Sequence, residues 1–165
     1  MSPRSESPDD WRGGLVLPGR TVVRGRGVQY RVPAGREPDF GLYLGVDYHP
    51  AWEHDRLEWP DFGLPRDPLV AVRAIEDLHA RARDGEYVET ACRAGKGRTG
   101  TVVACLAILD GLPASHAVGW TRKHFHHRAV QTPWQRRWVR GFEALRGRHG
   151  AEVTARSRFP GRGTG

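Results

Sequence analysis

A glycine-rich segment, Cys92–Gly100, constrains this chain more than any other part of its sequence. The segment follows the strand-like run Tyr87–Ala91 and precedes Thr101–Leu109, which is nearly all apolar, as in a helix buried on most sides. Glycines let the backbone curl so that successive N–H groups point inward, and a helix N-terminus adds partial positive charge. A strand, a glycine loop and a helix in this order therefore predict a binding site for phosphate or a similar anion.

The side chains of this segment indicate nucleophilic chemistry as well as anion binding. Helix N-termini and nearby cations lower the pKa of a cysteine thiol, so Cys92 is a candidate nucleophile. Arg98 is a candidate phosphate ligand because a guanidinium group can bind two phosphate oxygens at once, and Thr99 can donate a hydrogen bond to the sulfur. The residues expected to surround the phosphate are Arg93, Ala94, Gly95, Lys96, Gly97 and Arg98.

Two other interpretations of the segment are possible. A glycine turn beside a buried cysteine would give the same residues, and a cysteine followed at a distance by an arginine is weak evidence in an arginine-rich chain. A nucleotide-binding loop fits less well, because Gly95-Lys96 is followed by Gly97 rather than by Ser or Thr. The strand before the loop and the apolar helix after it favour the anion site.

Strand and helix patterns alternate along the chain. Apolar residues recur at helical spacing over Pro68–Arg83, with Asp67 as the expected N-terminal cap. Two further helices are predicted at Pro113–His124 and Pro133–Arg146, and three strands at Thr21–Val23, Val28–Val32 and Gly41–Val46. The alternation predicts a single α/β domain with a central, mostly parallel twisted sheet flanked by helices.

The two ends of the chain are expected to lie outside this domain, which is assigned to residues 12–150. Residues 1–11 are rich in Ser, Pro and Asp and are predicted to form a disordered tail, and residues 151–165 a flexible one. The N-terminus lacks the apolar core of a signal peptide, and no run approaches the roughly 18 apolar residues of a membrane span. A cytoplasmic protein without a membrane span is therefore predicted.

Charge and cysteine content narrow the list of partners. The net charge of +7 suits an anionic partner, but the arginines are scattered along the chain, which does not favour nucleic-acid binding. The two cysteines are too few for a disulfide framework, and no Cys/His spacing resembles a zinc site. Cys105 is expected in the core rather than as a resolving thiol, and His124, His126 and His127 in a basic rim rather than as metal ligands. No metal or cofactor is expected.

Three segments together resemble the protein tyrosine phosphatase superfamily. Cys92–Gly100 resembles its signature loop, and Trp59–Pro65 resembles its mobile acid loop. The segment Gln131–Gln135 resembles the loop whose glutamine orients the hydrolytic water. The segments occur in the order found in the family, and the resemblance spans roughly residues 40–145.

This resemblance implies a phosphatase fold of the compact, dual-specificity type. It also implies a phosphocysteine intermediate on Cys92, phosphate binding by Arg98 and proton donation by Asp61, with Gln131 or Gln135 holding the water. The implied reaction needs no metal, and the leading substrate is a phosphorylated protein or peptide, above all phosphotyrosine.

One departure from the family and one further resemblance leave alternatives open. Ala91 stands where family members usually carry a histidine that helps to lower the thiol pKa, so a catalytically weak, phospho-binding relative is one alternative. Arg93 and Lys96, together with Gln135-Arg136-Arg137, are similar to the loops of phosphatases that act on phosphoinositides. A phosphoinositide is therefore the alternative substrate.

Overall fold

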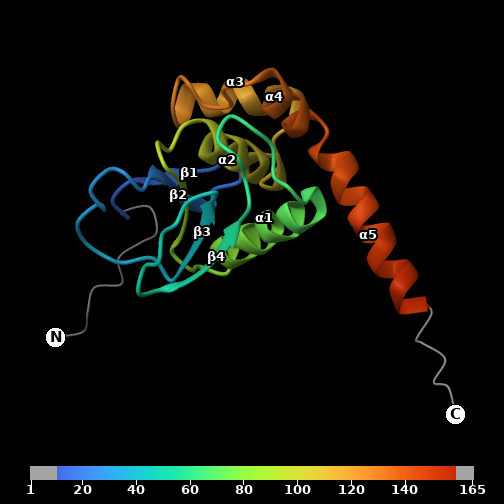
Figure 1. The fold of residues 1–165 in the computed structure, drawn as a ribbon, viewed down its shortest axis with the longest axis horizontal. Helices are drawn as coiled ribbons and strands as arrows, with labels where there is room; N and C mark the ends of the chain where they lie inside the picture. The colour runs from blue at the N-terminus through green and yellow to red at the C-terminus, as the bar shows by residue number, and fades with distance from the viewer. Residues whose placement is uncertain (1–10, 159–165) are drawn as a thin grey trace, which may run out of the picture.

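The computed structural model describes residues 11–158, which form a five-stranded sheet and five helices (Figure 1). The strands are β1 (Gly14–Val16), β2 (Val22–Gly27), β3 (Phe40–Leu44), β4 (Glu53–Leu57) and β5 (Val88–Cys92). The helices are α1 (Pro68–Arg83), α2 (Gly97–Leu109), α3 (Ala114–His124), α4 (Pro133–Arg140) and α5 (Phe142–Arg158). The strand order is β1-β2-β5-β3-β4, and every neighbouring pair is parallel except β1–β2. The predicted single-domain α/β fold with a mostly parallel sheet is confirmed.

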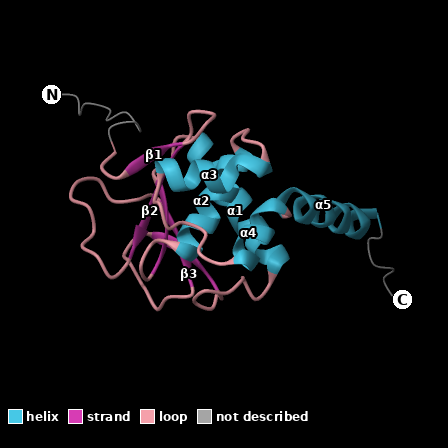
Figure 2. Ribbon diagram, turned by 90° about the horizontal axis from the view of Figure 1, so that it is seen from above, coloured by secondary structure: helices cyan, strands magenta, loops and turns pink. Residues whose placement is uncertain are grey.

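The helices cover one face of the sheet (Figure 2). Alternate residues of the central strands, such as Leu42 of β3 and Val88 of β5, are buried in one apolar cluster with Ile75 of α1 and most of α2. Asp67 caps α1 by accepting hydrogen bonds from the N–H groups of the two residues after Pro68, as predicted. Helix α2 is buried over almost its whole length, so packing in the core fixes the position of the loop that precedes it.

The opposite face of the sheet carries a buried charged cluster. Glu89 of β5 is fully buried and binds Arg24 and Arg26 of β2 at 2.6 and 2.9 Å and the hydroxyl of Tyr43 at 2.8 Å. Burial opposes ionisation of Glu89, but the hydrogen bonds and charges of the two arginines outweigh it, and the pKa of Glu89 is lowered. The cluster thus replaces an apolar core on this face by paired charges.

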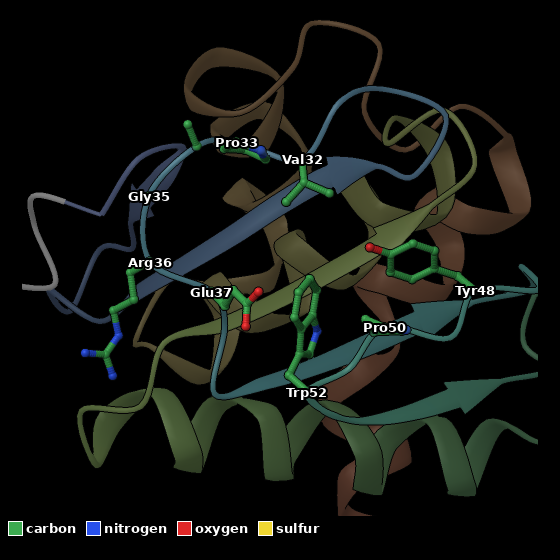
Figure 3. A pocket seen from close by; sticks show the side chains of 9 residues that line it. Val32, Pro33, Gly35, Arg36, Glu37, Tyr48, Pro50 and Trp52 are labelled. Atoms are coloured by element: carbon green, nitrogen blue, oxygen red, sulfur yellow. The ribbon is translucent and has the colours of Figure 1, made fainter.

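Two loops cover this charged face. A pocket of about 370 Å³ lies between them. Val32 and Arg36 line it from one loop, and Tyr48 and Trp52 line it from the other (Figure 3). The polar atoms of the two aromatic residues are occupied, since the Tyr48 hydroxyl accepts from Arg26 and the Trp52 indole donates to Tyr43. The loop that carries Tyr48 and Trp52 is therefore tied to the cluster beneath it.

Several strand predictions need correction. The strand predicted at Thr21–Val23 continues through two glycines to Gly27, while Val28–Val32 forms a turn and loop instead of a strand. The glycines permit close packing, because a Cβ at Gly25 would lie 2.7 Å from the Phe125 ring and one at Gly27 would lie 2.6 Å from the backbone of Ala94. Strands β1 and β4 were not predicted.

The helix boundaries also differ in part. Helix α2 begins at Gly97, inside the glycine segment, and the helix predicted at Pro133–Arg146 is two helices that meet at Gly141. The break lets Phe142 pack into the core against Trp138, while α5 extends away from the sheet (Figure 1). The expected domain end at residue 150 falls within α5, so residues 151–158 of the predicted C-terminal tail 151–165 are helical. Trp11, the last residue of the predicted N-terminal tail 1–11, is buried, and residues 1–10 and 159–165 lie outside the described residues. Across residues 11–158, no helix combines the length and apolar character needed to cross a membrane.

Candidate active site

Cys92 lies at the base of the glycine loop, where β5 ends and α2 follows after four residues. Its side chain is 2% exposed, and its sulfur accepts hydrogen bonds from the Gly95 N–H at 3.2 Å and from the Thr99 hydroxyl at 3.0 Å. The Thr99 oxygen in turn accepts a hydrogen bond from the Cys92 N–H at 2.8 Å. Gly95 adopts a φ of 74°, which glycine reaches without strain and which lets the loop curl over the sulfur.

Arg98 is anchored on one side and has a free donor on the other. Its Nη1 donates to the carbonyl oxygens of Leu44, Gly45 and Trp59 at 3.0 to 3.3 Å, and the residue is only 4% exposed. Within the described part of the chain, its buried Nε has no hydrogen-bond partner. A buried cationic donor without a partner costs free energy, so an anion in the loop would satisfy it.

The acid loop reaches Arg98 from the other side of the site. Trp59 is buried and donates from its indole N–H to the carbonyl of Gly63 at 2.8 Å, which closes the loop on itself. Asp61 follows with a side chain that is 61% exposed, and its Oδ1 lies 3.4 Å from Arg98 Nη2. The carboxylate thus lies at the mouth of the site, beside the group expected to bind phosphate.

The two candidate glutamines occupy different environments. Gln131 is exposed and lies against the glycine loop, so closely that a Cβ on Gly97 would be 2.5 Å from its Oε1. Gln135 is fully buried, and its Oε1 accepts from the N–H groups of Gln131 and Thr132 in a capping box at the start of α4. Its Nε2 donates to Gly63 of the acid loop at 3.1 Å.

The basic residues near the loop divide into two groups. Burial and the positive charges of His127, Lys96 and Arg128 lower the pKa of His126. The ring of His124, the last residue of α3, instead stacks on Trp120 of the same helix. Within residues 11–158, no group of three or more His, Cys, Asp or Glu residues could hold a metal ion.

Cys105 lies in the apolar core on α2. It is fully buried, and burial together with the charge of Glu143 raises the pKa of its thiol. A raised pKa keeps this thiol protonated and weakly reactive. These surroundings are those of a core side chain, as the sequence predicts.

The departure at Ala91 has a steric explanation. In the parallel register Ala91 lies between Arg26 of β2 and Tyr43 of β3, on the same face of the sheet as Glu89. Ala91 is fully buried, and its two neighbours are large side chains committed to the Glu89 cluster. A small residue therefore fits at this position.

Sequence reasoning missed two contributors to the site. Phe62 has a φ of 58°, unusual for a residue with a side chain, and its carbonyl accepts a 2.5 Å hydrogen bond from the Trp134 indole. Two of the three backbone carbonyls that hold Arg98, those of Leu44 and Gly45, lie at the end of β3, where the only sequence signal is the glycine after the strand.

Comparisons with known proteins find a phosphatase family and phosphatases of similar sequence. The model of a family described as PTP-SAK, Swiss Army Knife protein, DSP-PTPase phosphatase domain, matches residues 48–144, more than half of the chain. Receptor-type tyrosine-protein phosphatase C from Homo sapiens is 33% identical over 92 residues, and the mouse protein matches equally. That match covers 53% of this chain and only 7% of the human protein, so the chain spans a small part of these relatives.

Solved structures share the fold. The crystal structure of Tk-PTP in the active form superposes with a TM-score of 0.60 at 24% identity, covering 81% of this chain and 98% of that one. Kinase-associated phosphatase, solved with its catalytic-site cysteine replaced by serine, has a TM-score of 0.53 at 18% identity over 64% of this chain and 70% of its own.

Proposed function

The chain belongs to the PTP-SAK family of DSP-PTPase phosphatase domains, and from this premise we propose that it hydrolyses phosphomonoesters through a phosphocysteine intermediate on Cys92. One observation carries the proposal. The Cys92 sulfur, held by Thr99 and a loop amide at the N-terminus of α2, shares a site with the free donor of Arg98 and the carboxylate of Asp61. Nucleophile, anion ligand and proton donor are thus assembled in one place.

In the first step the Cys92 thiolate attacks phosphorus, so that a sulfur–phosphorus bond forms as the phosphorus–oxygen ester bond breaks. Protonated Asp61 gives its proton to the departing oxygen, which leaves as an alcohol or a phenol. Arg98 Nε and the loop N–H groups bind the remaining phosphoryl oxygens and stabilise the charge that spreads over them.

In the second step water attacks the phosphocysteine and releases inorganic phosphate. The Asp61 carboxylate accepts a proton from that water, and Cys92 leaves as a thiolate stabilised by the Thr99 hydroxyl. We assign the water-orienting role to Gln131, because its amide lies against Gly97 in the phosphate loop. Gln135 already uses its amide to bind Gln131, Thr132 and Gly63.

Phosphotyrosine in a protein or peptide is the substrate that the mouth of the site supports best. Phe62 and Trp134 are exposed by 55% and 50%, and a hydrogen bond joins them beside Asp61. Exposed aromatic rings next to a phosphate site offer a surface on which a phenyl ring can pack. The cytoplasmic location inferred from the polar N-terminus stays a prediction.

A phosphoinositide is the second candidate substrate. Lys96 lies inside the loop, and its positive charge is one of three that, together with burial, lower the pKa of His126; the others are those of His127 and Arg128. Several cations on one side of the phosphate would bind a second phosphate group on the same substrate. A single phosphotyrosine has no such second group.

The proposal is tested by comparing wild-type protein with Cys92→Ser on an aryl phosphate, with reductant and a metal chelator present. We expect turnover by wild type, none by the variant, and a phosphorylated Cys92 peptide in wild type after a rapid acid quench. Turnover that survives in Cys92→Ser would refute the phosphocysteine route. A wild-type protein that binds vanadate without hydrolysing any ester would be a phospho-binding module instead.

The substrate is tested separately. Release of phosphate from a phosphotyrosine peptide is compared with release from vesicles that contain a phosphatidylinositol monophosphate. Faster release from the peptide, and no selective loss in Lys96→Ala, is expected if the aromatic mouth governs selection. Faster release from the lipid, abolished in Lys96→Ala, would replace phosphotyrosine by phosphoinositide.

A further inference from the structure

The acid loop is fastened to the first turn of α4 by two side chains. The Trp134 indole donates to the carbonyl of Phe62 at 2.5 Å, and the Gln135 amide donates to the carbonyl of Gly63 at 3.1 Å. Both acceptors follow Asp61 directly in the chain. The position of the Asp61 carboxylate therefore depends on contacts made by the segment that also carries Gln131.

The loop needs such contacts because its own conformation is unfavourable. Phe62 has a positive φ of 58°, a region in which a side chain with a Cβ costs free energy. Its ring is 55% exposed, so packing of the side chain contributes little to holding the backbone there. Within the loop itself, the Trp59 indole and the Gly63 N–H provide two hydrogen bonds, to the carbonyls of Gly63 and Pro60.

Gln135 connects the acid loop and the glutamine loop through one buried amide. Its oxygen accepts from the Gln131 N–H at 3.0 Å while its nitrogen donates to Gly63. The residue is fully buried, so no water competes for these contacts. The groups proposed to move the proton and to hold the water are thus connected by a single side chain.

We propose that Trp134 and Gln135 form a latch that holds the acid loop closed over Arg98 and sets the position of Asp61 relative to Gln131. The inference rests on the proposed function for its kinetic consequence, but the contact itself does not depend on turnover. Neither residue touches the reacting atoms, so both are positioning residues. Opening the latch would withdraw Asp61 while leaving the phosphate loop intact.

Trp134→Phe tests the latch, since it removes the N–H donor and keeps an aromatic ring on the half-exposed position. Hydrogen exchange of the amides of residues 62–64 should accelerate about 2- to 12-fold, the effect of losing one hydrogen bond. For an aryl phosphate whose phenol is a poor leaving group, kcat/KM should fall by about the same factor. A nitrophenyl phosphate, whose leaving group needs little protonation, should lose less, so that the dependence on leaving-group pKa steepens.

Two controls separate positioning from general damage. Trp120→Phe changes a partly buried indole on α3, stacked on His124, and should alter neither exchange at residues 62–64 nor the leaving-group dependence. In an Asp61→Asn background, Trp134→Phe should have no further effect on kcat/KM, because the group that it positions is already gone.

The outcomes distinguish the latch from the enzyme mechanism. Unchanged exchange in Trp134→Phe, or equal losses on both aryl phosphates, would refute the latch even if the phosphatase mechanism is correct. If wild type hydrolyses neither ester but exchange at residues 62–64 still accelerates in the variant, the latch stands and the proposed function fails.

Discussion

The phosphate loop and the acid loop meet at Arg98, but different forces hold them in place. Cys92, Arg98 and Thr99 are each at most 4% exposed, and the helix that follows them is buried in the core. Asp61 and Phe62 are more than half exposed, and a few side-chain hydrogen bonds to carbonyl groups keep their loop in position. One region is held by the core of the protein and the other by contacts at its surface.

The difference suggests that the two loops have separate roles, phosphate binding for the buried loop and proton transfer for the surface loop. A buried loop with fixed N–H groups and a fixed arginine is prepared to bind a phosphoryl group without rearranging, which is how electrostatic stabilisation is most effective. A surface loop with few contacts opens at low cost, and segments that must admit substrate and release product belong to this class. Phosphate binding and proton transfer should therefore respond to different mutations.

Arg98 is part of the phosphate loop and contacts the acid loop, so Arg98→Lys should reduce turnover more than any other substitution considered. Lysine cannot make the three bonds to Leu44, Gly45 and Trp59 while also binding phosphate bidentately. We expect kcat/KM for an aryl phosphate to fall about 10³- to 10⁵-fold, the range for arginines that stabilise phosphoryl transfer. Vanadate affinity should fall as well. The matched control is Arg140→Lys, an exposed arginine at the end of α4, which should be silent.

Asp61→Asn should remove proton transfer by the acid loop and leave phosphate binding unchanged. The amide keeps the shape of the side chain but cannot give up or accept the proton, so turnover should fall about 10²- to 10⁴-fold. Vanadate binding, measured by titration, should stay near the wild-type value because the phosphate loop is unaffected. A loss of vanadate affinity that parallels the loss of turnover would show that the two regions are one unit.

The sequence predicted the buried region well. Pro68–Arg83 was predicted to the residue because a cap, an N-terminal proline and an apolar period all agree. Cys92 ends the buried strand β5, and Arg98 and Thr99 lie in the first turn of the buried helix α2, so local patterns were enough to predict a loop that joins them.

The surface region was harder to predict, for a physical reason. Strand β4, Glu53–Leu57, is a charged edge strand with one buried residue and therefore has no apolar pattern to detect. The different environments of Gln131 and Gln135 depend on tertiary contacts with Gly97 and Gly63. The break at Gly141 likewise reflects the burial of Phe142, which no local pattern encodes.

Ala91→His tests how tightly the buried region beside the phosphate loop is packed. A histidine at this position would have to fit between Arg26 and Tyr43, beside the Glu89 cluster. Overfilling a packed site costs about 1–3 kcal/mol, so the free energy of unfolding in urea should fall by that amount. Ala91→Ser, which adds a single atom, is the matched control and should cost less. An Ala91→His protein as stable as wild type would show that the position is not sterically restricted.

Gln131→Ala should have the smallest effect and decides between the two glutamines. Removing a side chain that lies against the phosphate loop but is exposed to solvent should leave the fold intact and slow hydrolysis of the intermediate about 2- to 12-fold, the value of one hydrogen bond. Rapid-quench measurements should then show a larger burst of phenol, because the intermediate forms at the wild-type rate and decays more slowly. Gln135→Ala should instead lower the free energy of unfolding and accelerate exchange in the acid loop, since it removes the capping box and the contact with Gly63. If Gln135→Ala enlarged the burst while Gln131→Ala did not, the buried Gln135 would be the residue that orients the hydrolytic water. Hydrolysis of the intermediate would then depend on the side chain that also holds the acid loop.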